Sequence, residues 1–255
     1  MTTTPVGDPG TELQAEEQTQ DRHPQDWRQS RWLVLVEVLL VALAFMAEAV
    51  HLIPTYLSIS RHWIPIGKIP FLVLLGWGSL RLRGLSWRDV GFAKKRSWLS
   101  ILALGAAAAV VMEVIDLYVS SPLLVRVMGR PPDLSVFRRI NGNLSLLLAE
   151  LAVVWTLAAF GEEMVWRGYL MNRLAGAGKS TRMAWIGALL LVNIGFGLAH
   201  SYQGLPGMID AGFIGLLLGL VYLAAGRDLL VAIVAHGLFD TIAFVMIYLG
   251  LYPYM

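Results

Sequence analysis

The chain has 255 residues, of which 56% are hydrophobic and only 15% are charged, and its mean hydropathy is +0.62. Soluble domains are about one quarter charged, and here the apolar residues come in long blocks, so composition indicates an all-α, polytopic membrane protein. The net charge of +2 gives no sign of a nucleic-acid partner, because the basic residues lie between the apolar blocks. The absence of cysteine excludes disulfides, a thiolate nucleophile and sulfur ligands for zinc.

The first 26 residues form a polar segment rich in proline, glycine, glutamine and glutamate. Such a segment buries too little apolar surface to offset its ordering entropy, so we expect residues 1–26 to be a disordered tail. The composition is not that of a secretory signal peptide, although the first apolar block could act as an uncleaved signal anchor. Residues 27–255 are then predicted to form one helical membrane domain.

The apolar blocks of that domain predict about seven transmembrane helices. Their lengths suit a hydrocarbon core of about 30 Å crossed at about 1.5 Å per residue. The second block is the shortest and has two prolines near its start. The predicted spans are roughly Trp32–Ile53, Ile64–Leu80, Trp98–Ser120, Leu144–Tyr169, Met183–Ser201, Gly207–Ala225 and Leu229–Leu251.

Lysine and arginine are concentrated before the first predicted span and in the loops after the second, fourth and sixth spans. With seven spans these segments share one side of the membrane, which predicts a cytoplasmic N-terminus and an outside C-terminus. The opposing loop, residues 122–143, carries four arginines of its own and weakens this bias. Its stretch LSVFRRI is suited to a short amphipathic helix at the interface. The basic residues on the predicted cytoplasmic side are Arg28, Arg31, Arg81, Arg83, Arg88, Lys94, Lys95, Arg96, Arg173, Lys179, Arg182 and Arg227.

Ionisable residues within the last four apolar blocks are the strongest functional signal, because charges inside a bilayer are costly. In GEEMVWRG, Glu163 and Arg167 are four residues apart and share one face of a helix, so they can pair. Glu162 points about 100° away and is free for another role. The alternative is that these charges lie near a helix end and contact headgroups.

Two further motifs place imidazoles in the following blocks. Phe196 and His200 share a helix face in FGLAH, although a single histidine at a helix end is more often a packing or interfacial residue. His236 and Asp240 share a face in AHGLFD, where the carboxylate can orient the imidazole. The alternative for this pair is a hydrogen-bonded fastening between two helices.

Small residues flank all three motifs and allow close approach of the helices, so we expect the polar groups to converge on one intramembrane cavity. A carboxylate and imidazoles can hold and deprotonate a water molecule by hydrogen bonding alone. They can equally do so with a divalent metal such as zinc, for which Glu162, His200 and His236 are the candidate ligands. A neighbouring histidine or aspartate can stabilise an oxyanion.

The three motifs, in this order on successive apolar blocks, resemble those of the CPBP family, which comprises type II CAAX prenyl endopeptidases and bacteriocin-processing and self-immunity proteins. The resemblance covers roughly residues 144–251. It implies an intramembrane endopeptidase of the bacterial plasma membrane, with a multi-helix fold and a cavity open to the cytoplasmic side. It also implies a peptide or protein substrate presented at or in the lipid bilayer, with or without a lipid modification.

The resemblance assigns roles position by position. Glu162 and His200 match the residues that activate the attacking water, and Glu163 and Arg167 match a supporting pair. His236 and Asp240 match the residues assigned to the oxyanion. Prenyl-processing members carry asparagine at the last position, and an ionised aspartate cannot donate a hydrogen bond. Asp240 would therefore be protonated, orient His236, or bind a metal.

Two other functions are compatible with parts of the pattern. A non-catalytic immunity or scaffolding protein would use the same fold to bind a partner's transmembrane segment. A transporter or proton relay also uses intramembrane glutamate and histidine, but it predicts repeat symmetry and broken helices, which the sequence lacks.

Overall fold

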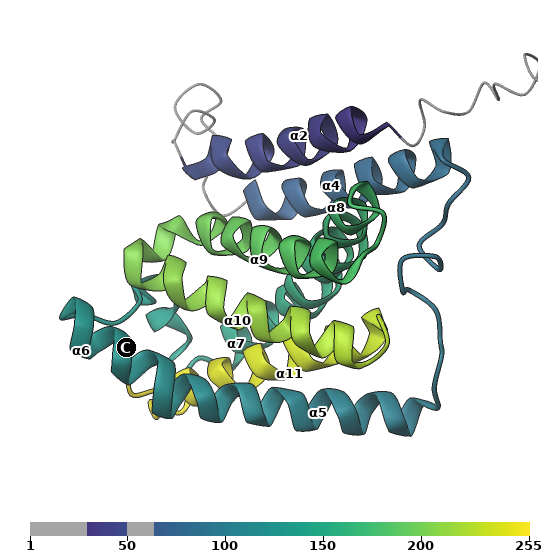
Figure 1. Ribbon diagram of the computed structural model, residues 1–255. Coiled ribbons are helices and arrows are strands. Elements are labelled where there is room, and N and C mark those ends of the chain that lie inside the picture. Colours follow the sequence, from purple (N-terminus) through teal and green to yellow (C-terminus); the bar gives the residue numbers. More distant parts are fainter. Residues whose placement is uncertain (1–29, 50–63) are drawn as a thin grey trace, which may run out of the picture.

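The computed structural model describes residues 30–49 and 64–255, and in these residues every regular element is a helix (Figure 1). The all-α prediction is therefore confirmed. The predicted tail, residues 1–26, and the end of the first predicted span lie outside the described residues. The elements are α2 (Arg31–Ala49), α4 (Ile64–Leu82), α5 (Trp98–Ile115), η2 (Asp116–Ser120), α6 (Ser121–Met128), η3 (Ser135–Ile140), α7 (Leu144–Val153), η4 (Val154–Glu162), η5 (Met164–Met171), α8 (Asn172–Ala177), α9 (Arg182–Ala199), η6 (Ser201–Gln203), α10 (Gly204–Ala224) and α11 (Leu229–Tyr248).

Five helical segments of the described chain are long and apolar enough to cross a membrane. They are Trp98–Met128, Leu144–Ala177, Arg182–Ala199, Ser201–Ala224 and Leu229–Tyr248, and they correspond to the last five predicted spans. α2 and α4 coincide with the first two predicted spans without meeting the same criterion, so the count of seven stays a prediction. In α4, Lys68, Pro70 and Arg81 lower the apolar content.

Polar side chains fix where the long helices begin. Ser97, Asn143, Thr181 and Asp228 each accept a hydrogen bond from a backbone N–H in the first turn of α5, α7, α9 and α11. These bonds satisfy donors that have no intrahelical partner, which is the reason such residues favour this position. Short polar loops therefore alternate with apolar helices, and the helices pack side by side as one bundle (Figure 1).

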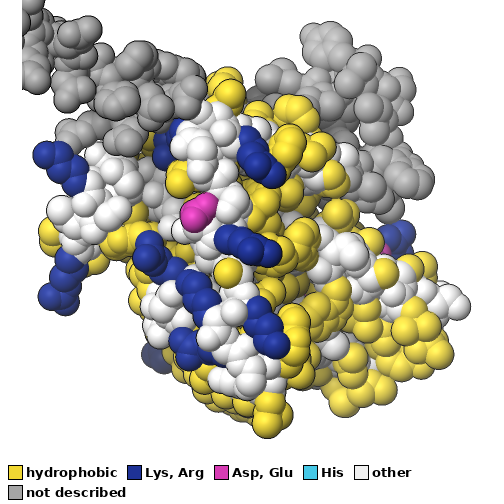
Figure 2. Space-filling view, turned by 90° about the vertical axis from the view of Figure 1, so that its right-hand side faces the viewer, with side chains coloured by type: hydrophobic (Ala, Val, Ile, Leu, Met, Phe, Trp, Pro, Cys, Tyr) yellow, Lys and Arg dark blue, Asp and Glu magenta, His cyan; other side chains and the backbone are white. Residues whose placement is uncertain are grey.

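The loops that follow α4 and α10 meet at one end of the bundle. Lys95 Nζ donates to the carbonyls of Gly226 and Arg227 at 3.1 and 2.8 Å. Gly91 accepts from Leu229 N at 3.1 Å and has φ +107°; a Cβ there would lie 2.4 Å from the Arg227 carbonyl oxygen. Figure 2 shows the resulting face, on which lysine and arginine side chains gather. The predicted grouping of the basic loops on one side is therefore seen in the fold.

The opposite end is built from residues 129–143, η6 and the C-terminus. Asp133 N donates to the Gln203 carbonyl at 2.9 Å, and Gly142 N donates to the Tyr248 carbonyl at 2.9 Å. The predicted short helix at LSVFRRI is present as the 3₁₀ helix η3.

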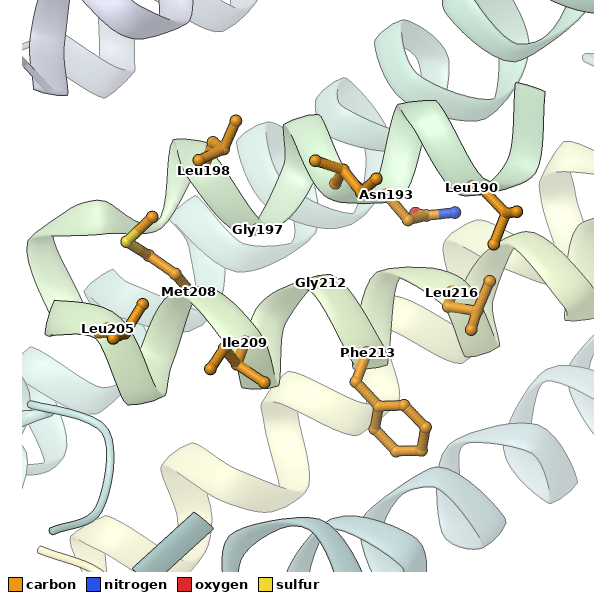
Figure 3. Close-up of a pocket in the computed structure, with 11 residues that line it drawn as sticks. Leu190, Asn193, Gly197, Leu198, Leu205, Met208, Ile209, Gly212, Phe213 and Leu216 are labelled. Carbon is orange, nitrogen blue, oxygen red and sulfur yellow. The ribbon is translucent and has the colours of Figure 1, made fainter. Parts of the chain in front are cut away.

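Glycines allow α9 and α10 to approach closely. A Cβ at Gly197 would lie 2.4 Å from the Met208 carbonyl oxygen, and one at Gly219 would lie 2.4 Å from the Leu189 side chain. The GxxxG of Gly215 and Gly219 thus serves helix packing, as predicted. On the outer side of this pair lies an apolar groove of about 380 Å³ (Figure 3). Its exposed leucine and isoleucine side chains suit contact with lipid acyl chains.

Acidic residues outside the three motifs contact other helices. Glu37 pairs with Arg83 and, at 3.5 Å, with Arg173. The Ser120 hydroxyl joins Asp116 and Asp210 at 2.9 and 2.5 Å. These contacts tie α2 to the loop that follows α4 and to α8, and η2 to α10, which indicates structural roles.

Candidate active site

The first motif lies on a π-helical stretch instead of the expected α-helix. The π-helix η4 ends at Glu162, the π-helix η5 begins at Met164, and Glu163 lies between them. Such stretches are rare and frequently occur at functional sites. A Cβ at Gly161 would lie 2.2 Å from Ile69 of α4, so this glycine lets α4 pack directly against the motif.

Glu163 and Arg167 form a fully buried ion pair, with Arg167 Nη1 donating to Glu163 Oε1 at 2.6 Å. The second guanidinium nitrogen donates to the Gly215 carbonyl at 2.7 Å and to Asn193 Oδ1 at 3.2 Å. The guanidinium carbon also lies 5.0 Å from the centre of the Phe196 ring. Arg167 thus connects the motif helix to α9 and α10, and the pairing predicted from the four-residue spacing is present.

His236 is held from both sides by carboxylates. Its Nδ1 lies 2.9 Å from Glu163 Oε1, and its Nε2 lies 3.5 Å from Asp240 Oδ2. An ionised carboxylate only accepts hydrogen bonds, so Nδ1 carries a proton and donates it to Glu163. This bond fixes the ring, and it directs Nε2 toward Asp240, one turn further along α11.

His200 caps the C-terminal end of α9 and is half-buried. Its Nδ1 lies 2.8 Å from the Phe196 carbonyl oxygen. A carbonyl can only accept, so Nδ1 is the protonated nitrogen and Nε2 keeps its lone pair in the neutral ring. The imidazole therefore presents a base or a ligand away from its own helix.

Glu162 is half-buried and makes no hydrogen bond or ion pair with another residue of the described chain. Its carboxylate lies within electrostatic range of His236, Lys68, Glu163 and Arg167, without a hydrogen bond or ion pair to any of them. Its carboxylate is therefore close to the third motif and is not engaged in the Glu163–Arg167 pair, as the sequence predicts.

Phe196 lies among the three motifs. The centre of its ring is 4.7 Å from that of His200 and 6.4 Å from that of His236. Around it, Glu163, Arg167 and His236 are buried, whereas Glu162, His200 and Asp240 are half-buried. The six predicted residues thus form an inner ion-pair network and an outer set with more accessible polar atoms. The wider cavity expected around them stays a prediction.

The sequence analysis did not single out Asn193 or the Gly215 carbonyl as partners of Arg167. An asparagine in the apolar block LLLVNIGFG was an available signal, because a buried amide requires partners. Trp155 was also missed: its Nε1 donates to Thr241 Oγ1 at 3.2 Å, and its ring packs 2.7 Å from where a Cβ at Gly237 would lie. These contacts position α11 against the motif helix.

The donor set does not fit a metal site as it stands. In residues 30–49 and 64–255, no group of three or more histidine, aspartate or glutamate side chains is arranged so that it could hold a metal ion. Both His236 nitrogens are directed at carboxylates, which leaves His200 Nε2 as the imidazole donor without such a partner. A catalytic zinc site takes three protein ligands.

The site does not lie at the basic end of the bundle. α9 begins at Arg182 beside the basic loops and ends at His200, next to η6 and the loop of residues 129–143. Glu162 lies near the middle of the Leu144–Ala177 span. The catalytic candidates therefore extend from the middle of the bundle toward the end that carries fewer basic loops.

The described residues thus form an apolar helical bundle with a buried polar centre, and five of its helical segments are long and apolar enough to cross a membrane. Residues 144–242 match the family described as Type II CAAX prenyl endopeptidase Rce1-like, and this range contains all six candidate residues. The matched range is less than half of the chain, and this similarity confirms the resemblance to the CPBP family. No curated protein and no solved structure matches the chain.

Proposed function

We propose that the chain is an intramembrane endopeptidase that hydrolyses a peptide bond of a membrane-associated peptide or protein, without a metal ion. Support comes from the match to the Rce1-like family together with the state of two imidazoles. His200 offers an unprotonated Nε2, and His236 has a fixed ring whose Nε2 faces Asp240. Amide hydrolysis requires a base and a proton donor close to each other. The two imidazoles meet this requirement, because both lie beside the buried Phe196 ring.

In the proposed reaction, Glu162 and His200 Nε2 hold a water molecule between them. One of them takes a proton from the water as its oxygen attacks the carbonyl carbon of the substrate. The carbonyl oxygen gains the negative charge of the tetrahedral intermediate. As the oxyanion collapses and the C–N bond breaks, the same proton is transferred to the nitrogen of the leaving amine, which restores Glu162 and His200. The products are an amine and a carboxylic acid, which loses its proton to solvent.

The oxyanion accepts a hydrogen bond from the Nε2–H of a protonated His236, which it shares with the Asp240 carboxylate 3.5 Å away. Glu163 accepts from Nδ1 and so favours the charged ring, while Asp240 stabilises the same charge from the other side. In this role Asp240 orients His236 and needs no proton of its own. Arg167 acts through Glu163 and is a positioning residue.

We infer from the positive-inside rule that the lysine- and arginine-rich face lies in the cytoplasm, and a cytoplasmic N-terminus stays part of this proposal. We propose a membrane-associated peptide or protein as the substrate and do not narrow it to prenylated proteins. The reason is that Asp240 stands where prenyl-processing members of the family carry asparagine. The competing function is a non-catalytic immunity or scaffolding protein. Glu162 disfavours that function, because its carboxylate makes no hydrogen bond or ion pair in the described residues, and a scaffold gains nothing from such an acid in a membrane helix.

The proposal is tested with Glu162→Gln and His200→Ala, using Glu150→Gln as the matched control. Glu150 lies on α7 of the same span and pairs with Arg139 at 3.0 Å, away from the motifs. Membrane extracts from cells that produce each variant are compared by proteomics for an uncleaved precursor. We expect the precursor to accumulate with Glu162→Gln and His200→Ala, but not with the wild type or Glu150→Gln. Normal processing by both site variants, inserted at wild-type levels, would show that the mechanism is wrong.

A further inference from the structure

A second site lies on the basic face, where the loop after α4 folds back over the end of that helix. It is a pocket of about 600 Å³. Its walls come from the last turn of α4 and from the loop up to Lys94. The lining residues are Trp77, Arg81, Ser86, Trp87, Arg88, Phe92, Ala93 and Lys94.

Three cations line this pocket, and none of its lining residues is acidic. Arg81 lies 5.7 Å from the centre of the Trp77 ring, and Lys94 lies 5.4 Å from that of Trp98. Arg88 is exposed. None of the three forms an ion pair with an acidic residue in the described part of the chain. The pocket therefore carries positive charge that no ion pair of residues 30–49 and 64–255 neutralises.

The other basic residues of the same loop are used differently. Arg83 pairs with Glu37, Lys95 donates to two backbone carbonyls, and Arg96 lies 3.6 Å from Asp228. These side chains fasten the loop to its neighbours. Arg81, Arg88 and Lys94 thus differ from these three residues, because they line the pocket and do not fasten the loop by ion pairs.

Asp89, the nearest acidic residue in the sequence, forms no ion pair with the three cations of the pocket. Its Oδ2 accepts from the Ser86 hydroxyl and from the Ser86 backbone N–H, both at 2.7 Å. These hydrogen bonds lower the pKa of Asp89 and keep its carboxylate turned to Ser86. They also close the turn that brings Trp87 and Arg88 to the pocket.

The pocket lies where lipid headgroups are expected. Trp77 and Trp98 are 47% and 55% exposed, and Leu74 and Leu99 beside them are 64% and 78% exposed. Exposed tryptophans next to exposed leucines are typical of the boundary between headgroups and acyl chains. Guanidinium and ammonium groups at this level are suited to phosphate oxygens.

We propose that this pocket binds the phosphate-bearing headgroup of an anionic membrane phospholipid, with Arg81, Arg88 and Lys94 on the headgroup and Trp77 along the start of the acyl chains. A lipid suits the pocket because its phosphate complements the three cations and because the pocket is continuous with a surface that faces lipid.

The inner wall of the pocket touches the catalytic segment. The Trp87 ring lies 3.1 Å from where a Cβ at Gly76 would be and 3.6 Å from one at Gly168. The Phe92 ring packs edge-on against Phe160, with centres 5.7 Å apart. Phe160 and Gly168 flank the Glu162–Arg167 motif. A lipid in the pocket thus supports the wall against which that motif packs.

The test measures lipid binding directly and does not depend on proteolysis. The full chain in detergent is titrated with phosphatidylglycerol or phosphatidylcholine, and bound lipids are counted by native mass spectrometry. The pocket variant is Arg81→Gln/Arg88→Gln/Lys94→Gln. The matched control is Arg126→Gln/Arg130→Gln/Arg138→Gln, which removes the same charge from exposed positions at the other end.

We expect phosphatidylglycerol to bind the wild type more tightly than phosphatidylcholine, and to bind the pocket variant about tenfold or more weakly. The control should change by less than about twofold. If the triple variant does not fold, Arg88→Gln alone should still weaken binding several-fold. Equal losses in both triple variants would reduce the effect to general surface charge and overturn the proposal.

Two competition arms separate the lipid from other anions. Release of bound phosphatidylglycerol by inorganic phosphate would identify a site for a free anion. Release by a short peptide with a free C-terminal carboxylate would assign the pocket to the substrate. Either result would overturn the lipid assignment, whereas failure of both to compete supports it.

Discussion

Replacing Arg167 by methionine should strongly destabilise the bundle. The side chain is fully buried and donates to Glu163, the Gly215 carbonyl and Asn193 at 2.6, 2.7 and 3.2 Å. Methionine keeps much of the packing against Phe196 but removes the guanidinium from the buried Glu163 carboxylate, which leaves His236 as its remaining partner. Removing one partner of a buried pair costs about 3–5 kcal/mol, and we expect Arg167→Met to lower the free energy of unfolding by this amount.

The same reasoning predicts that a second substitution restores stability. Glu163→Gln in the Arg167→Met background removes the buried charge, so the double variant should be more stable than Arg167→Met alone. The free energies of unfolding of wild type, both single variants and the double variant are measured by SDS titration of the purified chain, followed by circular dichroism. We expect a coupling energy of about 1–3 kcal/mol.

Arg139→Met is the control, because Arg139 forms an exposed pair with Glu150 and should cost less than about 1 kcal/mol. Additivity of the two substitutions within about 0.5 kcal/mol would show that the buried pair does not contribute as a unit. The role of Arg167 in positioning His236 through Glu163 would then lose its physical basis.

Four shorter predictions address the site, the packing and the topology. Asp240→Asn should retain more cleavage than Asp240→Ala, because the amide can still hydrogen-bond to a neighbour; equal and complete losses with release of bound metal would contradict a hydrogen-bonding role. Treatment with a chelator should leave cleavage unchanged, and restoration of a chelator-inhibited activity by zinc would contradict the metal-free proposal. Gly197→Ala should cost about 1–3 kcal/mol of unfolding free energy, because its Cβ would lie 2.4 Å from a backbone oxygen of α10. Gly187→Ala, with nothing within 4 Å, should be neutral or stabilising, and similar effects of the two would refute the close-packing argument. Because the chain lacks cysteine, Arg182→Cys and Tyr202→Cys can report the two ends of α9 to an impermeant thiol reagent on intact cells. Only Tyr202→Cys should react, and labelling of Arg182→Cys instead would reverse the proposed orientation.

The parts of the site that the sequence predicted are those fixed within one helix. The pairs Glu163–Arg167 and His236–Asp240 follow from a four-residue spacing, which puts both members on one face whatever the helix packs against. Both pairs are present, at 2.6 and 3.5 Å. The separation of Glu162 from its neighbour was predictable for the same reason.

The parts that were missed depend on contacts between helices. The bond from Arg167 to Gly215 joins backbone and side chain 48 positions apart, and no local pattern encodes it. The π-helical form of the first motif was also unexpected, since single-residue insertions in the hydrogen-bonding pattern depend on packing against other helices. Two of the seven predicted spans, the first and the second, are not among the five segments that meet the length and composition test in the described residues. In the second span, charge and proline lower the hydropathy.

The position of the site restricts how a substrate can reach it. α9 has 18 residues, so about 27 Å of helix separate its basic end from His200. A peptide entering from the basic face in an extended form would need about eight residues to cover that distance, at about 3.3 Å each. A substrate held within the bilayer, beside the lipid-exposed side chains of α9 and α10, reaches the same depth without crossing the basic face (Figure 3). Under the proposed function, the fold therefore disfavours a soluble peptide that enters from the basic face and favours a substrate whose cleaved bond already lies at the depth of the site.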